Sequence, residues 1–245
     1  MAIKILMSAG AKGGTGKSTF IRFAITWLQD AGVAPYLIDA DDENSTLSRF
    51  FPQAHKIVPS RIKSNDVIID TAEKGEHPLI IVDLKAGVGN AMLNWVADVP
   101  FDELKELGIS ITLIGVVTSS PDSVSSLLRW VNFLGKRVKY IVVKNLKDSD
   151  AWEQKPEEVL LPEYDKTKQA LEFRKLYKPA EIVMPALDPE YQGELERLNL
   201  TIRDVLAKHP NTPPALNGLI VRSKLRNYQA RLYEAFAAHK DLLLP

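Results

Sequence analysis

The sequence contains no cysteine, which excludes disulfide bonds, thiol nucleophiles and thiolate metal sites. It also lacks an excess of either charge, because 31 basic residues balance 31 acidic ones. A globally basic nucleic-acid-binding protein is therefore not indicated, although a local basic patch stays open. No apolar run approaches the roughly 20 residues that span a bilayer, and we find no signal peptide, internal repeat or low-complexity segment. We therefore expect a cytoplasmic protein.

The chain of 245 residues is 45% hydrophobic, enough to bury a large core, and one α/β domain over 1–245 is the simplest organisation. Short runs rich in Ile, Val and Leu alternate with helical stretches. The runs are apolar throughout, as in strands that are covered on both faces. We expect strands at 3–8, 34–39, 78–83, 109–118, 137–144 and 180–184. We expect helices at 17–31, 64–74, 88–98, 121–135, 166–176, 189–208 (continuous or broken) and 215–240, so that a helical segment from about 189 to 245 ends the chain.

This alternation predicts a mostly parallel central sheet with helices on both faces, a three-layer α/β/α architecture. In such folds, ligands bind beyond the carboxyl ends of the strands. The strand ends relevant here are Ser8, Asp39, Asp83, Thr118 and Lys144. A polar or glycine-containing loop follows each of them, which supports both the fold and this position for a site.

A glycine-rich loop, GAKGGTGKST at 10–19, joins the first predicted strand to the first predicted helix. Its glycines let the backbone curl around phosphate oxygens and direct N–H groups inward, as in P-loop nucleotide-binding proteins. Lys17 can reach the β- and γ-phosphates, and the Ser18 hydroxyl can ligate Mg²⁺. The predicted nucleotide contacts in the loop are Gly13, Gly14, Thr15, Gly16, Lys17, Ser18 and Thr19. A glycine-rich turn with two surface lysines is the alternative, which the flanking strand and helix disfavour.

Three aspartates stand at the ends of predicted strands beside this loop. Asp39 and Asp41 end the run Tyr-Leu-Ile-Asp-Ala-Asp, and Asp83 ends Leu-Ile-Ile-Val-Asp, which has the form of a Walker B motif. A triphosphate with Mg²⁺ needs carboxylates near the metal and an oriented water for hydrolysis. Any one of the three alone could be a helix cap or a turn residue. Their order and spacing together favour a nucleotide site.

The loop resembles the deviant Walker A motif of the ParA/MinD family of ATPases, because it reads Lys-Gly-Gly-Thr-Gly-Lys-Ser from Lys12 to Ser18. The strict P-loop pattern fails at Ala11, where it requires Gly. The resemblance covers roughly residues 1–190 and is strongest over 1–45. It implies that Asp39 and Asp83 support the metal together with Ser18, and that Asp41 helps to position the attacking water.

Later segments resemble the same family in the same order. The resemblance implies that Asn145, at the end of Val-Val-Lys-Asn, recognises adenine and that Pro185 also lines the base. Two positions depart from the family pattern. Asp42 in the first switch and Lys85 in the second each stand where many relatives have proline. The change at Lys85 bears on how hydrolysis is coupled to conformational change more than on nucleotide binding.

The resemblance also implies a mechanism. ATP or ADP with Mg²⁺ is the expected cofactor, and Lys12 is expected to contact the phosphates bound by the partner subunit of a homodimer. ATP would then favour the dimer and hydrolysis would release it. Lys12, Lys17 and Asp41 are the expected catalytic residues of a slow ATPase that a partner protein activates. The implied processes are plasmid or chromosome partition, conjugation and positioning of cellular machinery, and the spacing after Asp41 resembles the plasmid-encoded TraL/StbC group.

Other functions stay open at this point. A metabolic P-loop ligase of the dethiobiotin-synthetase or cobyrinate-amidase type would generally lack the lysine found at position 12. A nucleotide-binding switch with impaired hydrolysis is suggested by Lys85. Nonspecific DNA binding needs a basic stripe, for which the candidates are Lys136, Arg137, Lys139, Arg222, Lys224 and Arg226. The final helix most simply packs one face on the body, and its interrupted apolar face disfavours membrane binding.

Overall fold

A computed structural model describes residues 2–10, 12–87, 89–147 and 160–245, so Ala11 lies outside the described part of the chain. In that part, seven parallel strands form one sheet in the order β3-β2-β4-β1-β5-β6-β7. The strands are β1 (Ile3–Ala9), β2 (Tyr36–Ala40), β3 (His55–Lys56), β4 (Leu79–Leu84), β5 (Ile109–Val117), β6 (Lys139–Asn145) and β7 (Ala180–Met184). The predicted parallel sheet is confirmed. The edge strand β3 was not predicted, because its two residues are exposed and form no apolar run.

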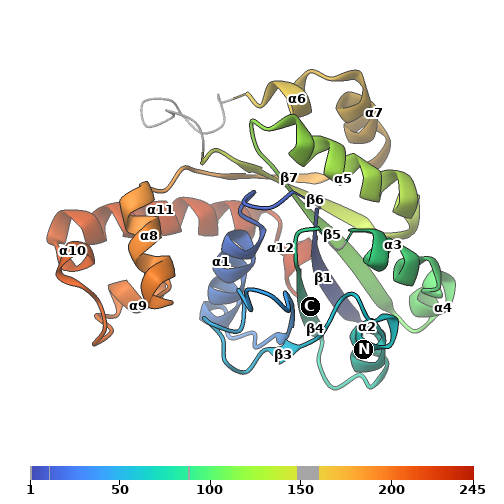
Figure 1. The fold of residues 1–245 in the computed structure, drawn as a ribbon, viewed down its shortest axis with the longest axis horizontal. Coiled ribbons are helices and arrows are strands. Elements are labelled where there is room, and N and C mark those ends of the chain that lie inside the picture. Colours follow the sequence, from blue (N-terminus) through green and yellow to red (C-terminus); the bar gives the residue numbers. More distant parts are fainter. Residues whose placement is uncertain (1, 11, 88, 148–159) are drawn as a thin grey trace.

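Helices cover both faces of the sheet (Figure 1). One hydrophobic cluster joins the sheet to α2 (Ile62–Glu73), α3 (Gly89–Ala97), α4 (Phe101–Glu106), α5 (Pro121–Leu134), α6 (Pro162–Asp165) and α7 (Lys168–Tyr177). A second cluster joins the other face to α1 (Lys17–Asp30), α8 (Pro189–Leu198), α9 (Ile202–Leu206), α10 (Pro214–Asn217), α11 (Leu219–Ala238) and α12 (Lys240–Leu243). The three-layer α/β/α architecture is therefore confirmed.

The strand β6 shows why these strands are apolar at successive positions. Tyr140 and Val142 pack in the first cluster, whereas Ile141 and Val143 pack in the second. Successive side chains of a strand point to opposite faces, and here both faces are buried. Burial of each such aliphatic side chain contributes roughly 1.5–3 kcal/mol.

The predicted helix over 189–208 is broken into α8 and α9. Asn199 ends α8 in the left-handed conformation, with φ at 53°. Thr201 then begins α9 with a capping box, in which its side chain and that of Asp204 each accept a hydrogen bond from the other's backbone N–H. The predicted helix over 215–240 is likewise divided, at Gly218, into α10 and α11, and α12 begins at its last residue.

The long helix α11 packs through one face, as predicted. Leu225, Tyr228, Leu232 and Phe236 are buried at helical spacing, and Phe236 meets Phe20 of α1 edge to face, with ring centroids 5.3 Å apart. The apolar residues at its beginning do not join this face, because Leu219 and the following Ile are exposed. Among the described residues, the search for a helix long and apolar enough to cross a membrane finds none.

Candidate nucleotide-binding site

The glycine-rich loop lies between the central strand β1 and helix α1, at the carboxyl end of the sheet. Gly14 and Gly16 have φ values of 69° and 94°, a left-handed conformation that glycine adopts without steric cost. The first turn of α1 contains no acidic residue. Its backbone N–H groups and helix dipole therefore favour an anion at this point. The loop and its neighbours line a cleft of about 330 Å³.

Lys17 is buried in this cleft, with 6% of its surface exposed. Its ammonium group donates a hydrogen bond to the backbone carbonyl oxygen of Lys12, at 3.0 Å. Burial lowers the pKa of Lys17, and the nearby charges of Asp83 and Asp41 oppose that effect. A phosphate group would place an anion directly beside this desolvated cation.

Asp83 is buried near the carboxyl end of β4, directly before Leu84 and Lys85, which line the cleft. Its Oδ1 accepts a hydrogen bond from the Ser8 hydroxyl at 2.8 Å, and that hydroxyl in turn accepts one from the Leu84 N–H. Its Oδ2 is buried and has no hydrogen-bond partner among the described residues. Burial raises the pKa of Asp83 to about 6; the Ser18 and Ser8 hydroxyls oppose the rise. A buried carboxylate oxygen without a partner suits a cation or its bound water.

Asp39 and Asp41 hold the loop that follows β2. The two oxygens of Asp39 accept backbone N–H bonds from Asp41 at 3.0 Å and Ser48 at 2.7 Å. Those of Asp41 accept from the Asn44 N–H at 3.0 Å and the Thr46 hydroxyl at 2.9 Å. Burial alone would raise the pKa of Asp41, but these hydrogen bonds outweigh it and lower the pKa. Asp41 also lines the cleft, so the loop that both aspartates hold borders it.

The three aspartates do not form a ready-made metal cluster. Asp39 and Asp83 are paired in register on adjacent strands. Nevertheless, the described residues contain no group of three or more His, Cys, Asp or Glu that could hold a metal ion. Magnesium usually keeps several waters and takes only one or two protein oxygens besides substrate phosphates. Ser18 and Asp83 would suit that kind of binding.

A second hollow of about 130 Å³ adjoins the loop on the side of β6 and β7, and Asn145 and Pro185 line it together with Gly14, Gly16 and Thr19. The Asn145 side chain also connects strand β6 to the P-loop. Its Nδ2 donates to the backbone oxygen of Thr15 at 2.8 Å, and its Oδ1 accepts from the Lys147 N–H at 3.1 Å. Asn145 therefore supports the P-loop itself, a role that the sequence did not reveal.

Lys12 points elsewhere. Its ammonium lies 3.3 Å from the carboxylate of Asp122, in the first turn of α5. Nearly half of the Lys12 side chain, 46%, is exposed, and Lys12 is not among the residues that line the cleft. The structure thus places the Lys12 ammonium outside the cleft of its own chain.

Lys85 also lines the cleft, and its partners were not predicted from the sequence. Its ammonium forms ion pairs with Asp42, at 3.3 Å, and with Glu43, both in the loop that follows β2. Glu43, Lys85 and Ala86 line the cleft with the P-loop. The sequence did contain a signal for this ion pair, because Asp42 and Lys85 are the two residues that stand where many relatives have proline.

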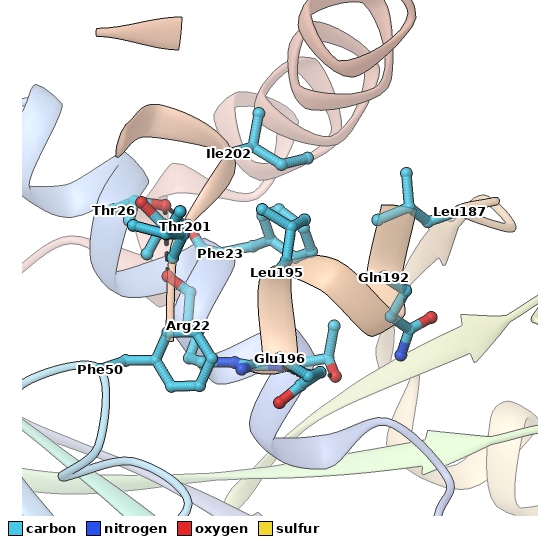
Figure 2. Close-up of a pocket in the computed structure, with 12 residues that line it drawn as sticks. Arg22, Phe23, Thr26, Phe50, Leu187, Gln192, Leu195, Glu196, Thr201 and Ile202 are labelled. Carbon is cyan, nitrogen blue, oxygen red and sulfur yellow. Dashed lines mark hydrogen bonds and ion pairs between the residues drawn. The ribbon is translucent and has the colours of Figure 1, made fainter. Parts of the chain in front are cut away.

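An apolar pocket adjoins the cleft where α8 meets α1, and Figure 2 shows Arg22 directed at Glu196 within it. Arg22 and Glu196 form an ion pair, and the guanidinium carbon lies 3.9 Å from the centroid of the Phe50 ring. The space measures about 30 Å³, which suits about one water molecule. This pocket is therefore too small for a nucleotide, and the ion pair connects α8 to the P-loop helix.

The structure brings most of the predicted nucleotide-site residues together, but it divides the predicted DNA-binding residues between two regions. Those lining the two hollows are Gly13, Gly14, Thr15, Gly16, Lys17, Ser18, Thr19, Asp41, Asn145 and Pro185. The basic candidates for DNA lie on separate elements. Lys136, Arg137 and Lys139 flank the start of β6, where Arg137 lies over the Phe101 ring, whereas Arg222, Lys224 and Arg226 lie on α11.

Comparison with known proteins places this geometry in a structural class. No protein-family model matches the sequence, and no curated protein matches it significantly. The MinD cell division protein of Aquifex aeolicus is similar with a TM-score of 0.53 and 16% identity, over 94% of this chain and 97% of that chain. The same protein in a MinC:MinD complex gives 0.52 and 16%, over 94% and 96%. A putative plasmid partition protein from Borrelia burgdorferi, bound to AMPPNP, gives 0.49 and 14%, over 98% and 100%.

The sheet and the P-loop define a P-loop NTPase fold of three α/β/α layers. The two MinD structures show that this chain has that fold in the form found in MinD. The predicted resemblance to the ParA/MinD family is therefore confirmed at the level of the fold.

Proposed function

We propose that this chain is a nucleotide-dependent switch of the ParA/MinD type, which binds Mg-ATP, dimerises around it and hydrolyses it slowly. One observation carries the proposal. The P-loop and the buried Lys17 line one cleft at the carboxyl end of a parallel sheet, and Asp83, whose charge acts on Lys17 and whose Oδ2 has no partner among the described residues, is buried directly before cleft residue Leu84. This is where open α/β sheets bind ligands, and each group suits one part of a metal-bound triphosphate.

Different residues would bind different parts of Mg-ATP. The backbone N–H groups of 13–19 would hold the phosphate oxygens, and Lys17 would neutralise the β- and γ-phosphates. The Ser18 hydroxyl would ligate Mg²⁺, Asp83 would hold it through water, and Asp39 would support that side of the site. Bound Mg²⁺ would supply further neutralisation of the phosphate charge. Asn145 and Pro185 line the hollow that would receive adenine.

Hydrolysis would depend on Asp41 and Lys12. Asp41 stays ionised because hydrogen bonds lower its pKa, so that it can accept a hydrogen bond from an attacking water. Lys12 is exposed and directed away from its own cleft, which suits contact with phosphates bound by a second copy of the chain. A cation at that point would stabilise charge in the transition state.

The output of such a switch would be its association with itself and with a partner protein. One similar structure is a MinC:MinD cell division protein complex, so MinD itself assembles with another protein. We propose an activating partner for this chain, a place in the cytoplasm, and a role in partition, conjugation or positioning. Nonspecific DNA binding would be a property of the ATP-bound dimer if the basic residues of two copies form a stripe.

Calorimetric titration with Mg-ATP and Mg-ADP tests the proposal, with phosphate release and sedimentation velocity measured on the same samples. We expect both nucleotides to bind, and ATP alone to produce dimers. Lys17→Ala should abolish binding, whereas Lys74→Ala, an exposed lysine at the end of α2, should not change it. Failure of the intact protein to bind either nucleotide would overturn the proposal. Binding and dimerisation without phosphate release would favour a switch with impaired hydrolysis.

A further inference from the structure

The ion pairs of Lys85 join the two loops that border the phosphate cleft. Lys85 follows β4, whereas Asp42 and Glu43 follow the neighbouring strand β2. The Lys85 ammonium lies 3.3 Å from Asp42 and also contacts Glu43. The Lys85 side chain is 17% exposed, but its bond to Asp42 lies at the surface and Glu43 is 69% exposed, so water screens these pairs. The ion pairs of Lys85 therefore link the loop after β4 to the loop after β2.

Lys85 lies at the end of the cleft where a terminal phosphate would be. The hollow that suits the base is on the side of β6 and β7, while Asp41, Glu43 and Lys85 line the opposite side, towards β2 and β4. The second-switch loop also approaches the P-loop closely. A Cβ atom at Gly13 would lie only 3.7 Å from the Cβ of Ala86. The phosphate most distant from the base therefore comes nearest to Lys85.

The backbone of Lys85 is fixed while its ammonium can change partners. Its N–H donates to the Ala40 carbonyl oxygen at 3.1 Å, which continues the pairing of β4 with β2. The lysine stem is flexible and its ammonium has three donors, so it can turn from a carboxylate to a phosphate without movement of the sheet. A terminal phosphate brings more negative charge than either carboxylate and would compete for the same cation.

We propose that Lys85 senses the terminal phosphate of a nucleoside triphosphate. It exchanges Asp42 and Glu43 for that phosphate, and so releases the loop that follows β2 when ATP is bound. ADP lacks the competing group and leaves the ion pairs intact. The inference rests on the proposed function, because it requires a nucleotide in this cleft. It assigns to Lys85 a discriminating role within the subunit, separate from that of Lys12 between subunits.

Affinities for Mg-AMPPNP and Mg-ADP, measured by calorimetry at concentrations where sedimentation shows monomers, test this role. Lys85→Met should weaken Mg-AMPPNP about tenfold, the usual scale for one charged hydrogen bond, and leave Mg-ADP within about twofold. The double variant Asp42→Asn with Glu43→Gln should act in the opposite direction, strengthening Mg-AMPPNP more than Mg-ADP. In the triple variant, the acidic substitutions should no longer alter the ratio of the two affinities. Lys74→Met serves as the control for loss of a surface lysine.

The outcomes separate this inference from the proposed function. If the intact protein binds both ligands but Lys85→Met leaves their affinity ratio unchanged, the sensing role is wrong and the nucleotide site stands. Equal changes in both affinities would also overturn it, because they would show a general charge effect. If the intact protein binds neither ligand, the proposed function and the inference fail together. A changed ratio with opposite signs in the two sets of variants would support the exchange.

Discussion

The ammonium of Lys12 is paired with the carboxylate of Asp122 on α5, 3.3 Å away, while Lys17 of the same loop is buried in the cleft. The two lysines of one motif therefore have different environments. The Lys12 pair is solvent-exposed on both sides, at 46% and 73%, and such pairs contribute little to stability. A phosphate from a second subunit could replace Asp122 at small cost.

Lys12→Ala should keep nucleotide binding and lose ATP-dependent dimers and turnover. The reason is that Lys12 lines no part of its own cleft, and within its own chain its loss removes only the exposed ion pair with Asp122. Calorimetry and sedimentation velocity with Mg-ATP measure the two properties. Asp122→Ala is the matched control, since it breaks the same ion pair but leaves the lysine, and dimers should form at least as readily. A Lys12→Ala protein that dimerised normally would contradict the role between subunits.

Gly16→Ala should destabilise the fold by roughly 2–4 kcal/mol. Its φ of 94° is strained for alanine, and the added Cβ would lie 2.4 Å from the Nδ2 of Asn145. That nitrogen cannot move aside without losing its hydrogen bond to Thr15. Urea denaturation measures the change in the free energy of unfolding.

Gly32→Ala separates the two causes of that loss. Gly32 also has a positive φ, 77°, but a Cβ there would meet no atom within 4 Å. It should cost only about 1 kcal/mol, the penalty of the left-handed conformation alone. Equal losses in the two variants would mean that the contact with Asn145 is unimportant.

The fold could be predicted because each of its main signals is local in the sequence. The strands β1, β4 and β5 are buried on both faces, so their residues are apolar at successive positions. The P-loop is a continuous motif, and the spacing of its glycines and lysine by itself predicts phosphate binding. The short elements β3, α4 and α6 were missed, since two to six residues show no period.

The rest of the site depends on contacts between residues that are distant in sequence. Nothing near Asn145 indicates that its amide supports Thr15, because packing of β6 beside the P-loop creates that contact. The same holds for Arg22 and Glu196, which meet only because α8 returns to cover α1. Such pairs follow from tertiary packing, and a single sequence does not specify them.

Arg22→Met should destabilise the protein by about 1–3 kcal/mol and loosen α8. The variant leaves the partly buried Glu196 with Arg49 as its remaining partner, 3.5 Å away and more exposed. Hydrogen exchange should become faster in α8 than in the central strands. Arg197→Met is the matched control, because its pair with Glu194 lies at the surface and its loss should leave stability unchanged. Unchanged exchange in α8 after Arg22→Met would show that the pair does not hold the helix.

Asp83→Asn should stabilise the nucleotide-free protein above pH 6 by an amount on the order of 2 kcal/mol. Burial raises the pKa of Asp83 from 3.8 to about 6, so the folded state binds a proton more tightly than the unfolded state does. Its contribution is therefore most favourable below about pH 4. It falls as pH rises to about 6, and the full cost of the buried charge is present above that pH.

Urea denaturation of both proteins between pH 4 and 8, with a chelator and no nucleotide, measures this difference. The gap between variant and parent should widen from pH 4 to 6 and then stay constant. Asparagine keeps an oxygen that can accept the Ser8 hydrogen bond, so the comparison isolates the charge. Asp70→Asn, an exposed carboxylate on α2, controls for loss of a negative charge at the surface. A gap that did not change with pH would mean that Asp83 is not held in a desolvated, ionised form. With the proposed Mg²⁺ role, the same substitution should weaken Mg-ATP binding even as it stabilises the free protein.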